Sequence, residues 1–131
     1  MAGNVLYIED NPDNMMLVRR VIQSGGYNLI EARTGLEGLA VAESQDIDLI
    51  LLDINLPDID GYEVAQRLRS STKARLENMP IIVLTANAMR GDAERALEAG
   101  CDTYMSKPIN IFELLEKVSA LLSREAQGND L

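Results

Sequence analysis

The chain has 131 residues and a formal net charge of −9, from 12 Lys and Arg against 21 Asp and Glu. This length predicts one domain with a single sizeable core, and the acidic balance without clustered basic residues argues against nucleic acid as a direct ligand. The sequence has no histidine and one cysteine, Cys101, which excludes histidine chemistry, an internal disulfide and a CxxC site. We read Cys101 as a small buried apolar side chain.

We expect a cytoplasmic protein that does not cross or enter a membrane. Three acidic residues, Glu9, Asp10 and Asp13, interrupt the first hydrophobic stretch, and no later stretch approaches membrane-spanning length. A single cysteine fits a reducing compartment.

Short aliphatic runs predict five strands. In chain order they lie at Val5–Ile8, Leu29–Ile30, Leu49–Leu52, Ile81–Leu84 and, more weakly, around Tyr104 and Met105. Helix-length segments separate these runs, which indicates repeated βα units and an α/β fold with a parallel sheet.

Five helices are predicted to follow these strands. The first begins at Asn11 and Pro12 and stops at Gly25 and Gly26, and three others begin at the capping pairs Thr34 with Glu37, Asp60 with Glu63 and Asn110 with Glu113. The remaining helix, from Gly91 to Gly100, has Leu97 as its only large apolar residue. We therefore expect it to be the least firmly held. The domain is predicted to span residues 4–124, with residues 125–131 as a short C-terminal tail.

Polar residues follow the predicted strands where each strand ends. The first strand is followed by Glu9 and Asp10, the third by Asp53, the fourth by Thr85, and the fifth by Ser106 and Lys107. In an open α/β sheet these carboxyl ends line one crevice, where ligands bind. A carboxylate beside a core must be paired, metal-bound or protonated. Four strands that end in this way indicate a site.

These residue types suit phosphoryl transfer. Three carboxylates brought together need a hard cation, and oxygen ligands without histidine or cysteine favour Mg²⁺. Lys107 supplies a compact positive charge and Thr85 a hydroxyl donor for a phosphoryl group. The attacking group would then be the carboxylate of Asp53, which would form an acyl phosphate.

Each of these residues taken alone has a commoner structural explanation. Asp53 could start a turn, Glu9 and Asp10 could favour the dipole of the first helix, and Lys107 could be an ordinary solvated lysine. Independent turns and caps do not explain why suitable chemistry falls at every relevant strand end. The joint pattern therefore favours a functional site.

Four strings, "YIEDNP", "LLDINLPDIDG", "VLTANA" and "YMSKPI", occur in this order along the chain. Together they resemble the receiver domain of two-component response regulators, and the resemblance runs from about Asn4 to Arg124. It implies a flavodoxin-like, doubly wound sheet of five parallel strands in the order 2-1-3-4-5 with five helices. In that order the first and third strands are neighbours, so Asp10 and Asp53 would meet.

The resemblance also implies a role for each matching residue. Asp53 would be the phosphoacceptor, and Glu9, Asp10, Asp53 and the backbone carbonyl of Asn55 would hold Mg²⁺. Thr85 and Lys107 would contact the phosphoryl group, Tyr104 would be the aromatic whose rotamer follows Thr85, and the peptide bond between Lys107 and Pro108 would be cis.

Since the chain has no histidine, the phosphoryl donor must act in trans, as a sensor histidine kinase or a histidine-containing phosphotransfer protein. The expected function is a switch that catalyses only its own phosphorylation and slow dephosphorylation. A downstream protein would read the state on a face formed by the Gly91–Gly100 helix, the strand around Tyr104 and the last helix.

Several alternatives remain beside this interpretation. An EF-hand is rejected because the position that should be acidic, counted back from Gly61, is Leu56. A haloacid-dehalogenase-type phosphatase needs an acid two residues after the nucleophile, where this chain has Asn55. A pseudo-receiver would bind partners without phosphorylation. The chain could be a stand-alone regulator or a receiver from a longer hybrid kinase, and Met1 with the short tail favours the first.

Overall fold

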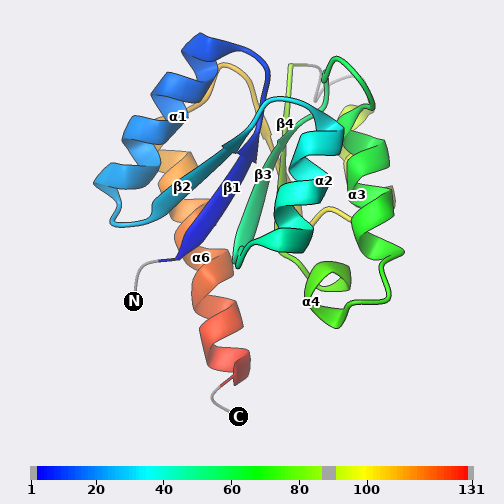
Figure 1. The fold of residues 1–131 in the computed structure, drawn as a ribbon. Coiled ribbons are helices and arrows are strands. Elements are labelled where there is room, and N and C mark those ends of the chain that lie inside the picture. Colours follow the sequence, from blue (N-terminus) through cyan, green and yellow to red (C-terminus); the bar gives the residue numbers. More distant parts are fainter. Residues whose placement is uncertain (1–2, 87–90, 130–131) are drawn as a thin grey trace.

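The fold is built on one parallel sheet, seen in a computed structural model that describes residues 3–86 and 91–129 (Figure 1). The strands are β1 (Asn4–Ile8), β2 (Asn28–Ala32), β3 (Leu49–Asp53), β4 (Ile81–Thr85) and β5 (Thr103–Ser106). Their order in the sheet is β2-β1-β3-β4-β5. The predicted fold class and strand order are confirmed, and β1 and β3 are neighbours.

The strands end level with one another at the carboxyl edge of the sheet. Ile8 pairs with Leu52, Asp53 with Leu84, and Thr85 with Ser106. Every residue of β3 and β4 is buried, whereas the edge strands β2 and β5 are partly exposed. The uninterrupted aliphatic runs of the central strands are what burial on both faces requires.

Helices cover both faces of the sheet (Figure 1). They are α1 (Pro12–Ser24), α2 (Gly35–Ser44), α3 (Gly61–Arg69), α4 (Ala74–Glu77), α5 (Asp92–Glu98) and α6 (Ile111–Asn129). One core includes Val18 of α1 and Val118 of α6, and the other includes Ala42 of α2, Leu68 of α3 and Ala96 of α5. The sheet is therefore doubly wound, as expected.

The predicted helix starts are confirmed by side-chain caps. Asn11 accepts a hydrogen bond from the N–H of Asn14, and the other three caps do the same three residues ahead: Thr34 from Glu37, Asp60 from Glu63 and Asn110 from Glu113. These bonds satisfy N–H groups that have no partner within the helix. The caps set where each helix leaves the carboxyl edge of the sheet.

The helix α5 begins differently. It starts after Gly91, whose φ is +87°, and has no side-chain cap. Only Ala93 and Ala96 within it are buried, and Leu97 is 51% exposed. Small buried side chains contribute little apolar burial, so this helix has the few anchors that the sequence predicted.

Two features of the helices differ from the sequence predictions. The helix α4 makes six helices in the described ranges, where five were expected. It has four residues, too few to show an apolar period, and is anchored by Leu76. The helix α6 runs on to Asn129, so residues 125–129, expected as a tail, are helical. Residues 87–90, within the "VLTANA" match and the segment after it, lie outside the described residues.

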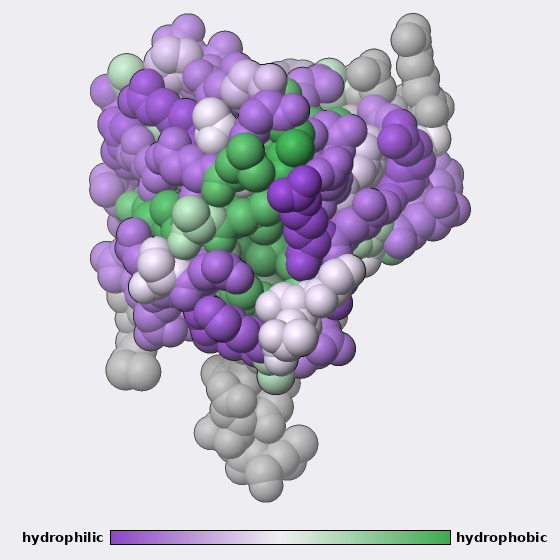
Figure 2. Space-filling model, turned by 45° about the vertical axis from the view of Figure 1, so that its right-hand side comes forward, coloured by the Kyte–Doolittle hydropathy of each residue, from purple (hydrophilic) through white to green (hydrophobic). Residues whose placement is uncertain are grey.

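The face of the molecule seen in Figure 2 is mostly hydrophilic. Figure 2 shows one stripe of apolar side chains between hydrophilic flanks on the side of α2 and α3. Among the described helices, none is both long enough and apolar enough to span a bilayer.

Cys101 is a free, buried thiol, and its burial raises its pKa to about 12, which agrees with a packing role.

Replacing Gly61 by Ala is expected to destabilise the protein by about 2 kcal/mol, measured by urea unfolding. A Cβ at Gly61 would lie 2.6 Å from the backbone oxygen of Asp53 and 2.9 Å from the Cα of Ile54, and backbone at the end of a central strand cannot move aside cheaply. An unchanged or increased stability, as helix propensity alone would predict for Gly to Ala, would contradict this close approach.

Candidate functional site

Three carboxylates meet at the carboxyl edge of the sheet. Glu9 and Asp10 follow β1, and Asp53 is the last residue of β3. One carboxylate oxygen from each lies within 4.8 Å of the others. Glu9 is 1% and Asp53 3% exposed, while Asp10 is exposed to solvent. The adjacency of β1 and β3 thus concentrates negative charge in a place that water reaches poorly.

Lys107 lies against two of these carboxylates. Its Nζ is 2.6 Å from Oδ1 of Asp53 and 3.4 Å from Oε1 of Glu9. Burial alone would lower the pKa of Lys107. The hydrogen bonds and charges of Asp53 and Glu9 raise the pKa by more than burial lowers it, so the net shift is upward. The backbone N–H of Lys107 donates to the carbonyl of Thr85, and the Lys107–Pro108 peptide bond is cis, as the resemblance implied.

Glu9 is held by two side chains that the sequence analysis missed. Oε1 of Glu9 accepts hydrogen bonds from the hydroxyl of Tyr7 at 3.2 Å and from Nδ2 of Asn14 at 2.8 Å. Tyr7 and Glu9 are two residues apart and so face the same side of the strand, which is a signal that the sequence contained. Burial and the neighbouring Glu9 charge raise the pKa of Tyr7, so it remains a donor.

The environment of Asp53 disfavours its ionised form. The pKa of Asp53 is raised to about 7, mainly by burial. The hydrogen bond from Lys107 lowers this pKa, and the hydrogen bond with Glu9 raises it. One lysine therefore does not balance the charge of this cluster, and a proton or a cation must complete it.

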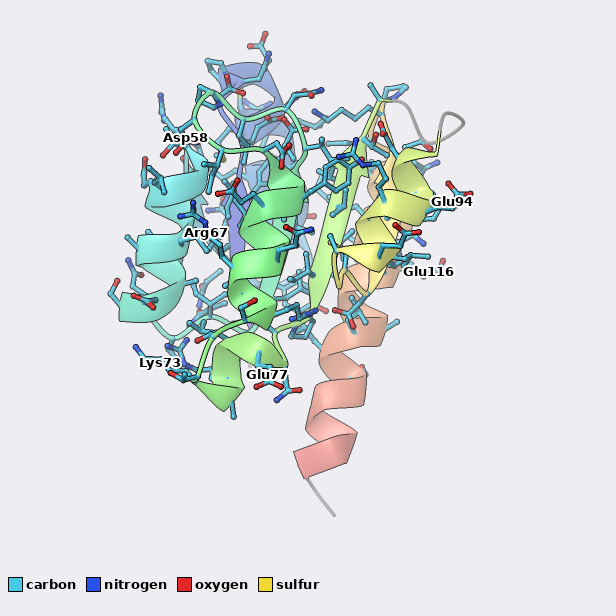
Figure 3. The ribbon with its side chains drawn as sticks, turned by 90° about the vertical axis from the view of Figure 1, so that its right-hand side faces the viewer. Asp58, Arg67, Lys73, Glu77, Glu94 and Glu116 are labelled. Carbon is cyan, nitrogen blue, oxygen red and sulfur yellow. The ribbon has the colours of Figure 1, made fainter. Side chains whose placement is uncertain are left out.

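The loop that carries Asn55 is fastened at two points. The carbonyl of Ile54 accepts from the N–H groups of Leu56 and Gly61. The carboxylate of Asp58 accepts from the N–H groups of Gly35 and Leu36 at the start of α2, both at 2.8 Å, and Figure 3 shows Asp58 above that helix. These backbone hydrogen bonds lower the pKa of Asp58, and the bond from Leu36 has the largest effect. The backbone around Asn55 is thus held beside Asp53.

Thr85 is 2% exposed at the end of β4, and its hydroxyl donates to Oδ2 of Asp92 at 3.0 Å. No sequence signal identified Asp92. Tyr104 of β5 pairs with Val83 of β4 and is 37% exposed. The structure therefore brings Glu9, Asp10, Asp53 and Lys107 together at one edge, with Thr85 in the neighbouring strand and Tyr104 on the more open β5.

This donor set fits a hard divalent cation. The carboxylates of Glu9, Asp10 and Asp53 offer oxygen atoms, the ligand type that Mg²⁺ prefers, and the backbone carbonyl of Asn55 in the following loop could offer another. A cation there would supply the positive charge that the raised pKa of Asp53 shows to be lacking. The carboxylate of Asp53 would then be ionised next to the ammonium group of Lys107, which is an arrangement suited to attack on phosphorus.

Comparison with known proteins decides the family. Residues 5–119 match the family model described as response regulator receiver domain. The chain belongs to the response regulator receiver family. A relative from Brucella ovis, named polar-differentiation response regulator DivK, is 42% identical over 122 residues, which covers 93% of this chain and 98% of the relative. Receivers of this family act as switches in two-component signalling, and they are not enzymes in the usual sense.

Solved receiver structures agree with this assignment. The receiver domain of the sensor histidine kinase PA1611 from Pseudomonas aeruginosa PAO1 has a TM-score of 0.86 and 34% identity, and covers 94% of this chain and 99% of its own. That structure has a magnesium ion coordinated in its active site cleft. A CheY-like receiver from Methanospirillum hungatei JF-1 has a TM-score of 0.87 and 29% identity, with coverage of 98% and 99%.

The raised pKa of Asp53 predicts a pH-dependent effect of Asp53→Asn when a chelator removes divalent cations. The folded-state pKa is about 7 against an ordinary value of 3.8. The folded protein therefore keeps a proton on Asp53 that the unfolded chain releases, and the contribution of Asp53 to stability falls as the pH rises from about 4 to about 7. Asn cannot ionise, so the variant should be more stable than wild type by at least about 1 kcal/mol at about pH 8.

Urea unfolding at about pH 4, 6 and 8 measures this difference. The advantage of Asp53→Asn should shrink toward pH 4, while the exposed-site control Asp46→Asn should show no such trend. A difference that stays constant across the three pH values would show that Asp53 is not the titrating group.

Proposed function

We propose that this receiver is a phosphoacceptor switch that takes a phosphoryl group onto Asp53 with Mg²⁺ bound beside it. The observation that carries the proposal is that Asp53 is buried beside Glu9 and Asp10, with its Oδ1 2.6 Å from the Nζ of Lys107. Glu9, Asp10, Asp53 and the backbone carbonyl of Asn55 are the proposed ligands of Mg²⁺. When bound, the cation would offset the charge of the carboxylates and of the incoming phosphoryl group.

The donor is a phosphohistidine on a sensor histidine kinase or a phosphotransfer protein, because the chain has no histidine of its own. An ionised oxygen of Asp53 attacks phosphorus, and the O–P bond forms as the N–P bond of the donor breaks. The donor ring, already protonated on its other nitrogen, takes the electron pair of the N–P bond and leaves as neutral imidazole. The product is an acyl phosphate on Asp53. We also propose a cytoplasmic location, with which the single buried thiol is compatible.

Lys107 and Thr85 would recognise the phosphoryl group. The ammonium group of Lys107 already contacts Asp53, so it lies within reach of an oxygen attached to the phosphorus on that side chain. The hydroxyl of Thr85 would donate to a second phosphoryl oxygen after it turns from Asp92. Placed donors of this kind stabilise charge that develops in transfer.

The proposed output is a change in protein contacts on the face formed by α5, β5 and α6. Phosphorylation adds about −1.5 to −2 charge next to Thr85, and the buried side chains of α5, Ala93 and Ala96, are small. Leu97 and Tyr104 are 51% and 37% exposed on this face. A downstream protein would bind one position of α5 and of the Tyr104 ring more tightly than the other.

The phosphatase alternative lacks its general acid. Asn55 occupies the position two residues after Asp53, and the nearby carboxylate of Asp58 is committed to the N–H groups of α2. Without an acid at that position and without histidine in the sequence, the acyl phosphate should persist long enough to act as a signal.

Incubation with Mg²⁺ and acetyl phosphate should add one phosphoryl group to the intact protein, detected by mass spectrometry. The addition should need both Asp53 and the cation, so Asp53→Asn and a chelated sample should stay unmodified. Release of free phosphate with rapid turnover would support the phosphatase instead. An unmodified wild type that also accepts nothing from a phosphohistidine donor would support the pseudo-receiver.

Lys107→Ala should separate cation binding from phosphoryl transfer. Removing the ammonium group takes positive charge from between Glu9 and Asp53, so Mg²⁺ should bind more tightly. The rate of phosphorylation should fall at least about tenfold, because a placed donor is lost. Calorimetric titration and acetyl phosphate kinetics measure the two effects.

Lys73→Ala is the matched control, since Figure 3 shows Lys73 by α4, at the end of the molecule remote from Asp58. It removes the same charge and should change neither quantity. Weaker Mg²⁺ binding by Lys107→Ala than by wild type would contradict the assigned charge balance.

A further inference from the structure

We propose that Asp92 is a positioning residue that holds the hydroxyl of Thr85 away from the phosphoryl site and so opposes the switch. This inference rests on the proposed function, in which Thr85 donates to a phosphoryl oxygen. It adds a competitor for that hydroxyl, located in the first turn of α5.

The hydrogen-bond chemistry makes the two partners of Thr85 exclusive. Oγ1 of Thr85 lies 3.0 Å from Oδ2 of Asp92. A carboxylate oxygen is an acceptor, so the hydroxyl is the donor, and a hydroxyl has a single proton to donate. Donation to a phosphoryl oxygen therefore requires that the bond to Asp92 break. Because Thr85 is 2% exposed, water competes poorly for this bond and the exchange is between two protein-held acceptors.

Asp92 also connects the site to α3 and α5. It is the first residue of α5, and its backbone carbonyl accepts a hydrogen bond from the hydroxyl of Tyr62 in α3 at 3.4 Å. One turn further along α5, the guanidinium group of Arg95 lies 4.1 Å from the centre of the Tyr62 ring, a cation–π contact. In this structure the first turn of α5 is tied to β4 through Thr85 and to α3 through Tyr62.

Loss of the Thr85 bond would leave α5 with the Tyr62 contacts and two buried alanines, Ala93 and Ala96. The same exchange that gives the phosphoryl group its hydroxyl donor would therefore release one tie on the first turn of α5. Asp92 would thus set the balance between the two states of the switch and pass the change to the α5 face.

The test uses Asp92→Ala, with beryllofluoride plus Mg²⁺ as the probe of the phosphoryl site and calorimetry as the readout. Removing the competing acceptor should tighten beryllofluoride binding about tenfold, the size expected for one hydrogen bond. Asp92→Asn keeps an acceptor oxygen without the charge and should fall between wild type and Asp92→Ala. Mg²⁺ affinity alone should not change, since Thr85 is not among the proposed ligands.

Glu94→Ala is the matched control for charge. Glu94 lies in the same turn of α5 but is exposed, and Figure 3 shows its side chain pointing outward. This variant should bind beryllofluoride as wild type does. Asp92→Ala should also give no tightening in a Thr85→Val background, because the hydroxyl in contention is then gone.

Two results would overturn the inference while leaving the proposed function intact. One is beryllofluoride binding to Asp92→Ala no tighter than to wild type, and the other is an equal gain with and without the Thr85 hydroxyl. Failure of the proposed function would look different: beryllofluoride would not bind wild type, or would bind Asp53→Asn equally well. Urea unfolding of each variant verifies that all of them are folded under the conditions of the titrations.

Discussion

The structure depends on an unbalanced group of charges at the carboxyl edge of the sheet. Glu9 and Asp53 are almost fully buried, and Asp10 lies beside them. Among the described residues, Lys107 is the cation that contacts Glu9 and Asp53. Burying a carboxylate is costly unless it is paired, and here the pairing is incomplete. The cluster therefore lacks positive charge. The raised pKa of Asp53 shows that it favours binding a proton, and in function a bound cation would supply the missing charge.

The rest of the fold holds this group in place. The strand order sets Glu9 beside Asp53 and Thr85 between Asp53 and the end of β5. Two buried apolar layers keep the sheet rigid, and hydrogen bonds accepted by the carbonyl of Ile54 and the carboxylate of Asp58 fix the loop after Asp53. The helix α5, in contrast, has few large anchors. A rigid acceptor next to a lightly held helix is the combination that a local charge change can drive.

The strands, the helix caps and the members of the acidic cluster could be predicted because each leaves a local pattern: an aliphatic run, a cap three residues before an acid, or a polar residue at a strand end. The helix α4 could not, because four residues carry no period and its anchor, Leu76, is fixed by tertiary packing. The contact between Thr85 and Asp92 joins different elements, so no spacing rule shows it. Tyr7 was a missed signal, since its alternation with Glu9 was visible.

The most direct test of the account is to locate the phosphoryl group chemically. Borohydride reduces an acyl phosphate to an alcohol, so protein treated with Mg²⁺ and acetyl phosphate and then reduced should yield a peptide in which Asp53 has become homoserine. Peptide mass mapping identifies the residue. Reduction at Asp53 alone is the predicted result. Reduction at Asp10 or Asp58, or a phosphorylated protein that borohydride does not reduce, would contradict the assignment of Asp53 as the phosphoacceptor.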